Sequence, residues 1–332
     1  MRLYNRFAAV VLAAAALAAP SLASADCQLL QLAEFKLDPR SESPIVSGEI
    51  NAHAVKVLID SGAAFSGVSS FAVNRLGLPT IEMMGMHAHG DGGDTQVYRA
   101  QVKELKVGGF SMAGLNLFVS GDDSRAGPAE LILGEDVLSK VDTEFDLAHN
   151  AIRLFQPKGC TAPQLVYWGA AYSQADLLPW NPDQPAIQTH AYINGKQILA
   201  ELDSGAQQTI IDAAAADAAG VAQTPASAPT ETFRGMGRQA VQSWTGRFDA
   251  FAIGDEKISH VSVQVMPFGQ GMTYTEVGAH SPGPLATMPA MVIGDDFLRA
   301  HRVFIDNEDR LILFSYQGGP VFSTPPVAAA AK

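Results

Sequence analysis

The apolar positions of this chain fall in short runs that are typical of β-strands. Alternating or β-branched runs end at Gly, Asn, Asp or Pro, as in Val97–Val107, Leu115–Val119 and Ser259–Val265. A helical spacing of apolar residues is confined to two short segments, Ser70–Leu76 and Ala213–Ala219. The pattern therefore predicts a mainly β protein with a few short helices.

The first 25 residues have a different pattern, which is that of a secretory signal peptide. Arg2 and Arg6 precede the apolar run 7–19, which is followed by Pro20 and the small residues Ala23-Ser24-Ala25. The run is shorter than the roughly 20 residues that span a bilayer, and no later segment is long and apolar enough to span one. We expect cleavage after residue 25, export to the periplasm or the medium, and no membrane span in the mature chain. An uncleaved N-terminal anchor is the alternative.

Two sequence blocks occur twice in the same order, which indicates a tandem duplication. Residues 55–63 (VKVLIDSGA) return as 197–206 (QILAELDSGA), and 131–138 (LILGEDVL) return as 291–298 (MVIGDDFL). Each second block leads to an apolar strand pattern, Ile152–Phe155 or Leu311–Phe314. The predicted organisation is an N-terminal lobe at 26–160, a connection at 161–184, a C-terminal lobe at 185–317 and a flexible tail at 318–332.

Composition narrows the possible partners. The 332 residues are only 17% charged, with a net charge of −12, and 47% are hydrophobic. That apolar content excludes a disordered chain, and the acidic balance argues against nucleic acid, whose phosphates require Lys and Arg. No nucleic-acid partner is expected.

The two cysteines, Cys27 and Cys160, flank the first lobe. Export leads to an oxidising compartment, so we predict a disulfide between them. Two free thiols are the first alternative. A lipidated Cys27 is the second, but Asp26 next to it does not suit a lipidation site.

The repeated Asp-Ser-Gly-Ala sequence carries the candidate chemistry. In each copy an Asp, Asp60 or Asp203, ends an apolar strand and is followed by a glycine that permits a tight turn. One such sequence would be an ordinary turn. On two duplicated lobes, a pseudo-twofold axis would bring the carboxyl groups together, where two acids about 3 Å apart share one proton. Such a pair can activate a water molecule against a peptide carbonyl.

These motifs resemble those of the retropepsin-like aspartic proteases. The shared order is a hydrophobic pair before Asp-Ser-Gly-Ala, then a glycine-rich hairpin, then a hydrophobic pair before Gly and a short helix. The resemblance implies two β-barrel lobes related by pseudo-twofold symmetry, both in one chain as in pepsin-like enzymes. We therefore expect a monomer that acts on peptides or unfolded proteins, with no cofactor and no metal.

The resemblance also implies roles for individual residues. Asp60 and Asp203 correspond to the catalytic pair. The residues that follow each Asp would support the pair, namely Ser61, Gly62, Ala63, Ser204, Gly205 and Ala206. The flaps over the substrate would be residues 85–96 and 233–242, with glycines Gly90, Gly92, Gly93, Gly235 and Gly237.

Two other functions remain open at this stage. One is a peptide-binding protein that keeps the fold without turnover. The other is a metal-dependent hydrolase that uses His87 and His89, whose side chains would point the same way on an extended strand. A polar hairpin tip is the simpler interpretation of that segment. The acids within and after the second block (Asp136, Asp146, Asp295, Asp296 and Asp306) are expected to cap turns and helices.

Overall fold

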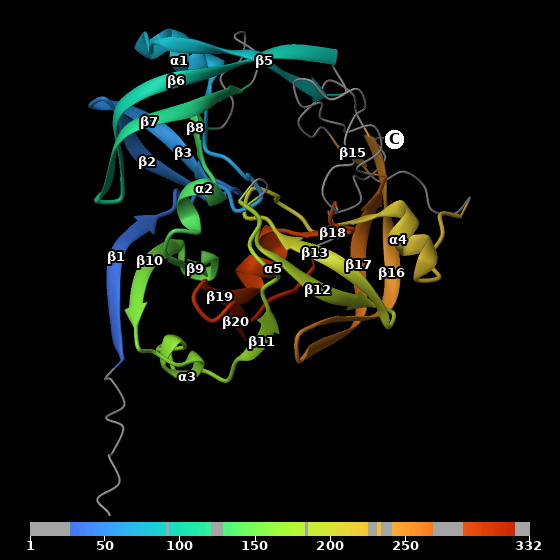
Figure 1. The fold of residues 1–332 in the computed structure, drawn as a ribbon. Helices are drawn as coiled ribbons and strands as arrows, with labels where there is room; N and C mark the ends of the chain where they lie inside the picture. The colour runs from blue at the N-terminus through green and yellow to red at the C-terminus, as the bar shows by residue number, and fades with distance from the viewer. Residues whose placement is uncertain are drawn as a thin grey trace, which may run out of the picture.

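The protein consists of two β-barrels and a sheet that joins them (Figure 1). The computed structural model describes residues 27–90, 93–120, 129–182, 185–224, 231–233, 241–267 and 288–322. Within these ranges, the side chains of residues 84–97, 120, 231–233 and 241 are not described. Mainly β structure was predicted from the sequence, and the strands confirm it.

The N-terminal barrel is a ring of strands that begins and ends at β2, because β2 also pairs with β6. A further strand, β5, lies against β6 and forms a hairpin with it. The order in the sheet is β2 (Ile45–Ile50), β3 (His53–Ile59), β8 (Leu131–Leu133), β4 (Gly67–Ser69), β7 (Phe110–Ser120), β6 (Gly93–Val107) and β5 (Thr80–Gly90). The helices α1 (Ser70–Leu76) and α2 (Glu135–Leu138) directly follow β4 and β8 in the chain.

The C-terminal barrel repeats this order strand for strand, as the duplication requires. Its ring closes through β12 and β16, and β15 takes the place of β5. The order is β12 (Gln188–Ile193), β13 (Lys196–Leu202), β18 (Met291–Ile293), β14 (Ile210–Asp212), β17 (Glu256–Met266), β16 (Val241–Ile253) and β15 (Glu231–Phe233). The helices α4 (Ala213–Ala218) and α5 (Asp295–Ala300) occupy the places of α1 and α2.

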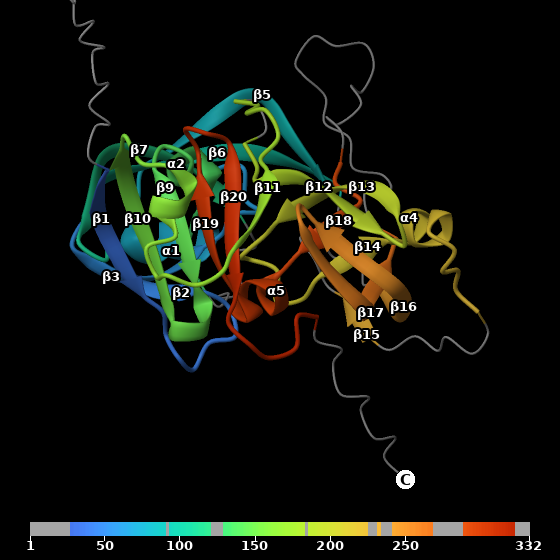
Figure 2. The same cartoon turned by 90° about the horizontal axis from the view of Figure 1, so that it is seen from below.

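A six-stranded sheet joins the two lobes, with its strands side by side in both views (Figures 1 and 2). Its order is β1 (Gln28–Lys36), β10 (Ala151–Lys158), β9 (Asp142–Asp146), β19 (His301–Asp306), β20 (Leu311–Tyr316) and β11 (Ser173–Asp176). The two halves meet where β9 pairs with β19. A short 3₁₀ helix, Leu147–His149, follows β9, and α3 (Ala162–Leu165) follows β10. The segment 161–184, predicted only as a connection, thus contributes α3 and β11.

Local sequence explains the shorter elements. The helix predicted at Ser70–Leu76 has those bounds, because the Ser69 hydroxyl caps its first turn and Gly77, at φ 60°, ends it in a left-handed conformation. The second predicted helix ends one residue earlier than expected, at Ala218. None of the helices in the described part of the chain is both long and apolar enough to cross a membrane.

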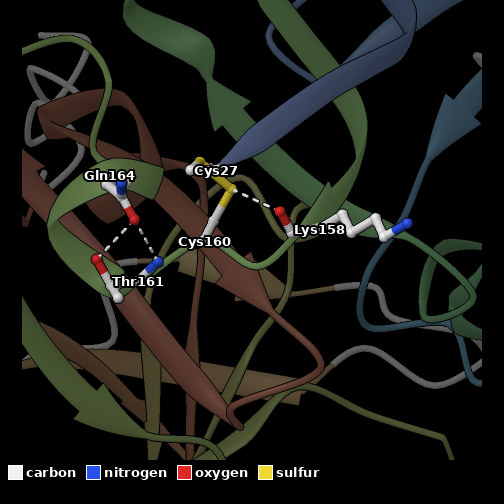
Figure 3. The surroundings of a disulfide bond; sticks show 5 residues. All are labelled: Cys27, Lys158, Cys160, Thr161 and Gln164. Carbon is white, nitrogen blue, oxygen red and sulfur yellow. Dashed lines mark hydrogen bonds between the residues drawn. A yellow bond between two sulfur atoms is a disulfide. The ribbon is translucent and has the colours of Figure 1, made fainter. Parts of the chain in front are cut away.

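The predicted disulfide between Cys27 and Cys160 is present (Figure 3). It lies at one end of the β1–β10 pairing, where Gln28, the first residue of β1, is opposite Lys158, the last residue of β10. The bond therefore fixes the outer strand of the joining sheet to its neighbour.

Removing this bond should lower stability without changing the fold. The bond closes a loop with a sequence separation of 133 residues, and its loss should cost about 5 kcal/mol in the chain-entropy model. We expect the Cys27→Ser, Cys160→Ser double variant to unfold at lower denaturant concentration, as measured by circular dichroism. Added reductant should shift wild type toward the variant and leave the variant unchanged. Equal midpoints for both proteins would contradict the assigned role.

Candidate active site

Asp60 and Asp203 occupy equivalent positions at the ends of equivalent strands. Asp60 follows β3 and its amide donates to the Leu133 carbonyl of β8 at 3.0 Å. Asp203 follows β13 and donates to the Ile293 carbonyl of β18 at 2.9 Å. The second repeated block thus forms the strand that holds each Asp in place.

The turn after each Asp fixes the orientation of its carboxylate. Oδ1 of Asp60 accepts hydrogen bonds from the amides of Gly62 and Ala63, at 3.0 and 3.1 Å. Oδ1 of Asp203 accepts from Gly205 and Ala206 at 2.7 and 3.1 Å. In both turns the amides leave Oδ2 available to a neighbouring group.

Each turn lies directly against the carboxylate of the other lobe. A Cβ atom placed on Gly62 would lie 2.2 Å from Cγ of Asp203, and one on Gly205 would lie 2.6 Å from Cγ of Asp60. Only glycine fits at either position. The carboxyl groups of Asp60 and Asp203 are hydrogen-bonded to each other, so the two predicted residues form one pair.

Burial changes the ionisation of this pair. Burial raises the pKa of Asp60 to about 7, and the charge of Asp203 adds to the rise. Burial likewise raises the pKa of Asp203, although the amides of Gly205 and Ala206 oppose it. The two carboxyl groups therefore titrate as a unit that keeps a shared proton into the neutral range.

The serines of the two motifs bind each other across the interface. The Ser61 amide donates to Oγ of Ser204 at 3.0 Å, and the Ser204 amide donates to Oγ of Ser61 at 3.0 Å. Each hydroxyl in turn donates to a backbone carbonyl of the opposite lobe: Ser61 to Leu202 at 2.9 Å and Ser204 to Ile59 at 2.8 Å. Both serines are fully buried, so this reciprocal network holds the two Asp-bearing turns in register.

A further set of hydrogen bonds, which the sequence did not predict and which we call braces, supports the segment after each Asp-bearing turn. In the N-terminal lobe, Oδ1 of Asp136 accepts from the amide and the hydroxyl of Ser66 at 2.8 and 2.6 Å. In the C-terminal lobe, Asp296 accepts in the same way from Thr209 at 3.0 and 2.6 Å.

The hydroxyl oxygens of Ser66 and Thr209 also accept hydrogen bonds from the amides of Gly134 and Gly294. Each brace therefore links the segment after the turn to the end of the neighbouring strand, β8 or β18. Asp136 and Asp296 were expected to cap turns and helices. In the structure they instead link distant segments. Asp306 does cap a turn, through the amides of Glu308 and Asp309.

Two further acids, Glu135 and Asp295, lie beside the pair, and Asp295 is 3.9 Å from the Arg299 guanidinium. Oε1 of Glu135 and both carboxylate oxygens of Asp295 are buried with no hydrogen-bond partner among the described residues. Burial raises the pKa of each group to about 8, and the charge of Asp60 contributes in both cases. Both groups are therefore uncharged over the range in which the pair keeps its proton.

The predicted flaps are described only in part. The backbone of β5 and β6 forms a hairpin whose last described pair is Gly90 with Gly93. In the C-terminal lobe, β15 pairs with β16, and its last described pair is Phe233 with Val241. Gly92, Gly235 and Gly237 lie outside the described residues, as do the side chains of His87 and His89. The flap and metal-ligand hypotheses for these residues remain predictions.

Two barrels that present paired carboxyl groups on Asp-Ser-Gly-Ala turns define the class of aspartic proteases. Comparison with family models agrees. Residues 46–140 match a family described as gag-polyprotein putative aspartyl protease, and residues 189–297 match one described as aspartyl protease. A comparison with curated proteins gives no significant match. The chain belongs to the retropepsin-like aspartic proteases and carries two units of that family in tandem.

Proposed function

We propose that this protein is an exported aspartic endopeptidase that hydrolyses peptide bonds in unfolded or extended protein segments. The observation that carries the proposal is the contact between the two carboxyl groups, which come from different lobes and share a hydrogen bond. A protein that only bound peptides would have no need for two buried acids in contact, whose like charges oppose ionisation. Export is supported by the signal-peptide pattern and by the disulfide, which is typical of oxidising compartments.

The reaction would proceed by general acid and base catalysis. A water molecule held between Asp60 and Asp203 attacks the scissile carbonyl carbon while the ionised carboxylate takes its proton. The protonated carboxyl group donates its proton to the carbonyl oxygen, which gives a tetrahedral diol. As the diol collapses, the carboxyl group that took the proton from water gives it to the nitrogen, the C–N bond breaks, and the other carboxylate takes a proton from a diol hydroxyl. The products are a carboxylic acid and an amine, and the pair again holds one proton. Neither a covalent intermediate nor a metal takes part.

The pH dependence of cleavage tests this proposal. The pair needs one proton and one negative charge, and its shared proton is lost as the pH rises through about 7, because burial raises the pKa of Asp60 to that value. We expect kcat/KM for an unfolded protein to fall above this range and to fall again in strong acid, where both carboxyl groups are protonated.

A chelator serves as the control. Cleavage should continue in its presence, whereas loss of cleavage would support a metal-dependent hydrolase built on His87 and His89. Peptide binding without cleavage at any pH would favour the peptide-binding alternative.

A further inference from the structure

The strand before each catalytic Asp presents one further side chain on the same face as the carboxylate. Successive residues of a strand point to opposite faces. On β3, Val57 and Ile59 are buried in the barrel core, so Leu58 and Asp60 point away from it. On β13, Ala200 and Leu202 are buried, so Glu201 and Asp203 point away from the core. Leu58 and Glu201 are therefore equivalent positions beside the dyad, the pair formed by Asp60 and Asp203, and one is apolar and the other acidic.

The pairing of neighbouring strands extends the contrast between an apolar N-terminal lobe and a polar C-terminal lobe beyond Leu58 and Glu201. Neighbouring residues in the register share a face, so each row continues the face of the dyad. The N-terminal row is Leu58, Ile132, Gly67, Phe118 and Arg99. The C-terminal row is Glu201, Val292, Ile210, Gln264 and Thr245.

The N-terminal row is mainly apolar and aromatic. Phe65, which follows the Asp60 turn and is 41% exposed, packs against Phe118 with 5.5 Å between ring centroids. The Arg99 guanidinium covers the Phe118 ring at 4.5 Å. In the C-terminal lobe the same places hold Gln208, Gln264 and Thr245, of which the last two are hydrogen-bonded to each other at 3.2 Å. The two lobes thus differ in chemistry on either side of the same dyad.

Glu201 has acidic neighbours and, among the described residues, no cationic partner. It is partly exposed, and its Oε2 accepts one hydrogen bond from Nε2 of Gln188 at 2.9 Å. No Lys, Arg or His forms an ion pair with it in the described part of the chain. Burial raises the pKa of Glu201 to about 7, with a contribution from the charge of Asp203, and Glu201 in turn raises the pKa of Glu135. A lysine or arginine side chain placed against this carboxyl group would supply the cationic partner and favour its ionised form.

We propose that Glu201 determines specificity by pairing with a lysine or arginine side chain next to the scissile bond, while the apolar row that begins at Leu58 takes a hydrophobic side chain on the other side. The inference rests on the proposed endopeptidase function, because it concerns the substrate of the same site. It makes the substrate asymmetric: cationic toward the C-terminal lobe and apolar toward the N-terminal lobe.

Matched peptides provide the test. Cleavage sites of the wild-type protein are first mapped by mass spectrometry of a digested unfolded protein. Peptides built on one site then carry either lysine or norleucine, which has a similar side-chain length and no charge, at each position flanking the cut. We expect wild type to prefer lysine at one flanking position by about tenfold or more in kcat/KM, because a charge-assisted hydrogen bond is gained.

Two variants assign that preference to Glu201. Glu201→Gln keeps the shape of the side chain and an acceptor for Gln188, and it should bring the lysine to norleucine ratio close to one. Glu49→Gln removes the same charge from an exposed position on β2 and should keep the wild-type ratio. A ratio that stays at the wild-type value in Glu201→Gln would overturn the inference and leave the endopeptidase function standing.

Binding to an inactive variant separates the two proposals. Peptides of fixed apolar sequence that carry one lysine or one norleucine, chosen without reference to cleavage and labelled for fluorescence anisotropy, are added to Asp60→Asn with and without Glu201→Gln. Lysine-selective binding that depends on Glu201, without cleavage by wild type, would contradict the endopeptidase and retain the recognition role of Glu201. Equal binding of both peptides to Asp60→Asn would overturn that role, whether or not wild type cleaves.

Discussion

Replacing either Asp60 or Asp203 with asparagine should lower kcat/KM for an unfolded protein by about 10³-fold or more, the range that general acid and base catalysis supplies. Asparagine has nearly the shape of aspartate, and its oxygen can still accept the amides of Gly62 and Ala63, or of Gly205 and Ala206. It cannot take a proton from water or share one with its partner. Because both acids serve one step, the double variant should be no less active than the single variants.

The fold of these variants is the control. Burial raises the pKa of both acids, so removing a charge that the interior disfavours should not lower the melting temperature near neutral pH. Circular dichroism in the aromatic region and thermal melts check this. Proteolysis at the wild-type level in both folded variants would exclude the two carboxyl groups as the catalytic pair.

Replacing either interface serine with alanine should be the most destabilising single change of a small side chain in this protein. Each hydroxyl donates to one carbonyl and accepts one amide of the opposite lobe, and both serines are buried. Ser61→Ala leaves the Ser204 amide and the Leu202 carbonyl without partners, at a cost of about 2–5 kcal/mol in unfolding free energy. We expect this loss in chemical denaturation, together with reduced activity, since the Asp-bearing turns lose their register.

Ser47→Ala is the matched control, because Ser47 is exposed on β2. Its effect should stay within about 0.5 kcal/mol. The two interface serines share one network, so Ser61→Ala and Ser204→Ala should be strongly non-additive in the double variant. Additive losses of the size seen for Ser47→Ala would show that the network does not hold the lobes together.

The sequence predicted the dyad and its immediate support because those residues are local. Asp60, Ser61, Gly62 and Ala63 are consecutive, and their repetition at 203–206 implied a partner lobe. The disulfide was predictable because only two cysteines were present. The strand patterns and the helix at Ser70–Leu76 likewise depend on neighbouring residues, and the structure confirms them.

What the sequence did not reveal depends on pairing between distant segments. The sheet that joins the lobes brings Phe145 opposite Val303, and no local pattern specifies that partner. The braces from Asp136 to Ser66 and from Asp296 to Thr209 also connect distant residues. A signal for them existed: aligning the two repeats places a hydroxyl residue six positions after Asp60 and Asp203, and an Asp two positions after each glycine of the second block.

The same alignment places Leu58 and Glu201 at equivalent positions, but the sequence alone did not show that both lie beside the dyad. Only the alternation of buried and exposed residues along β3 and β13 shows that both positions share a face with the dyad. The duplication thus preserved the residues that support the carboxyl groups, while the residues beside them diverged between the lobes.

Titration with a statine-type peptide, whose hydroxyl group mimics the tetrahedral diol, tests most directly whether the two lobes of one chain form a single catalytic site. Calorimetry and residual proteolysis are measured together against the amount of added peptide. The structure predicts one peptide bound per chain, full loss of proteolysis at that ratio, and much weaker binding to Asp60→Asn. Proteolysis that continues at saturating peptide, or two peptides bound per chain, would contradict a shared site between Asp60 and Asp203.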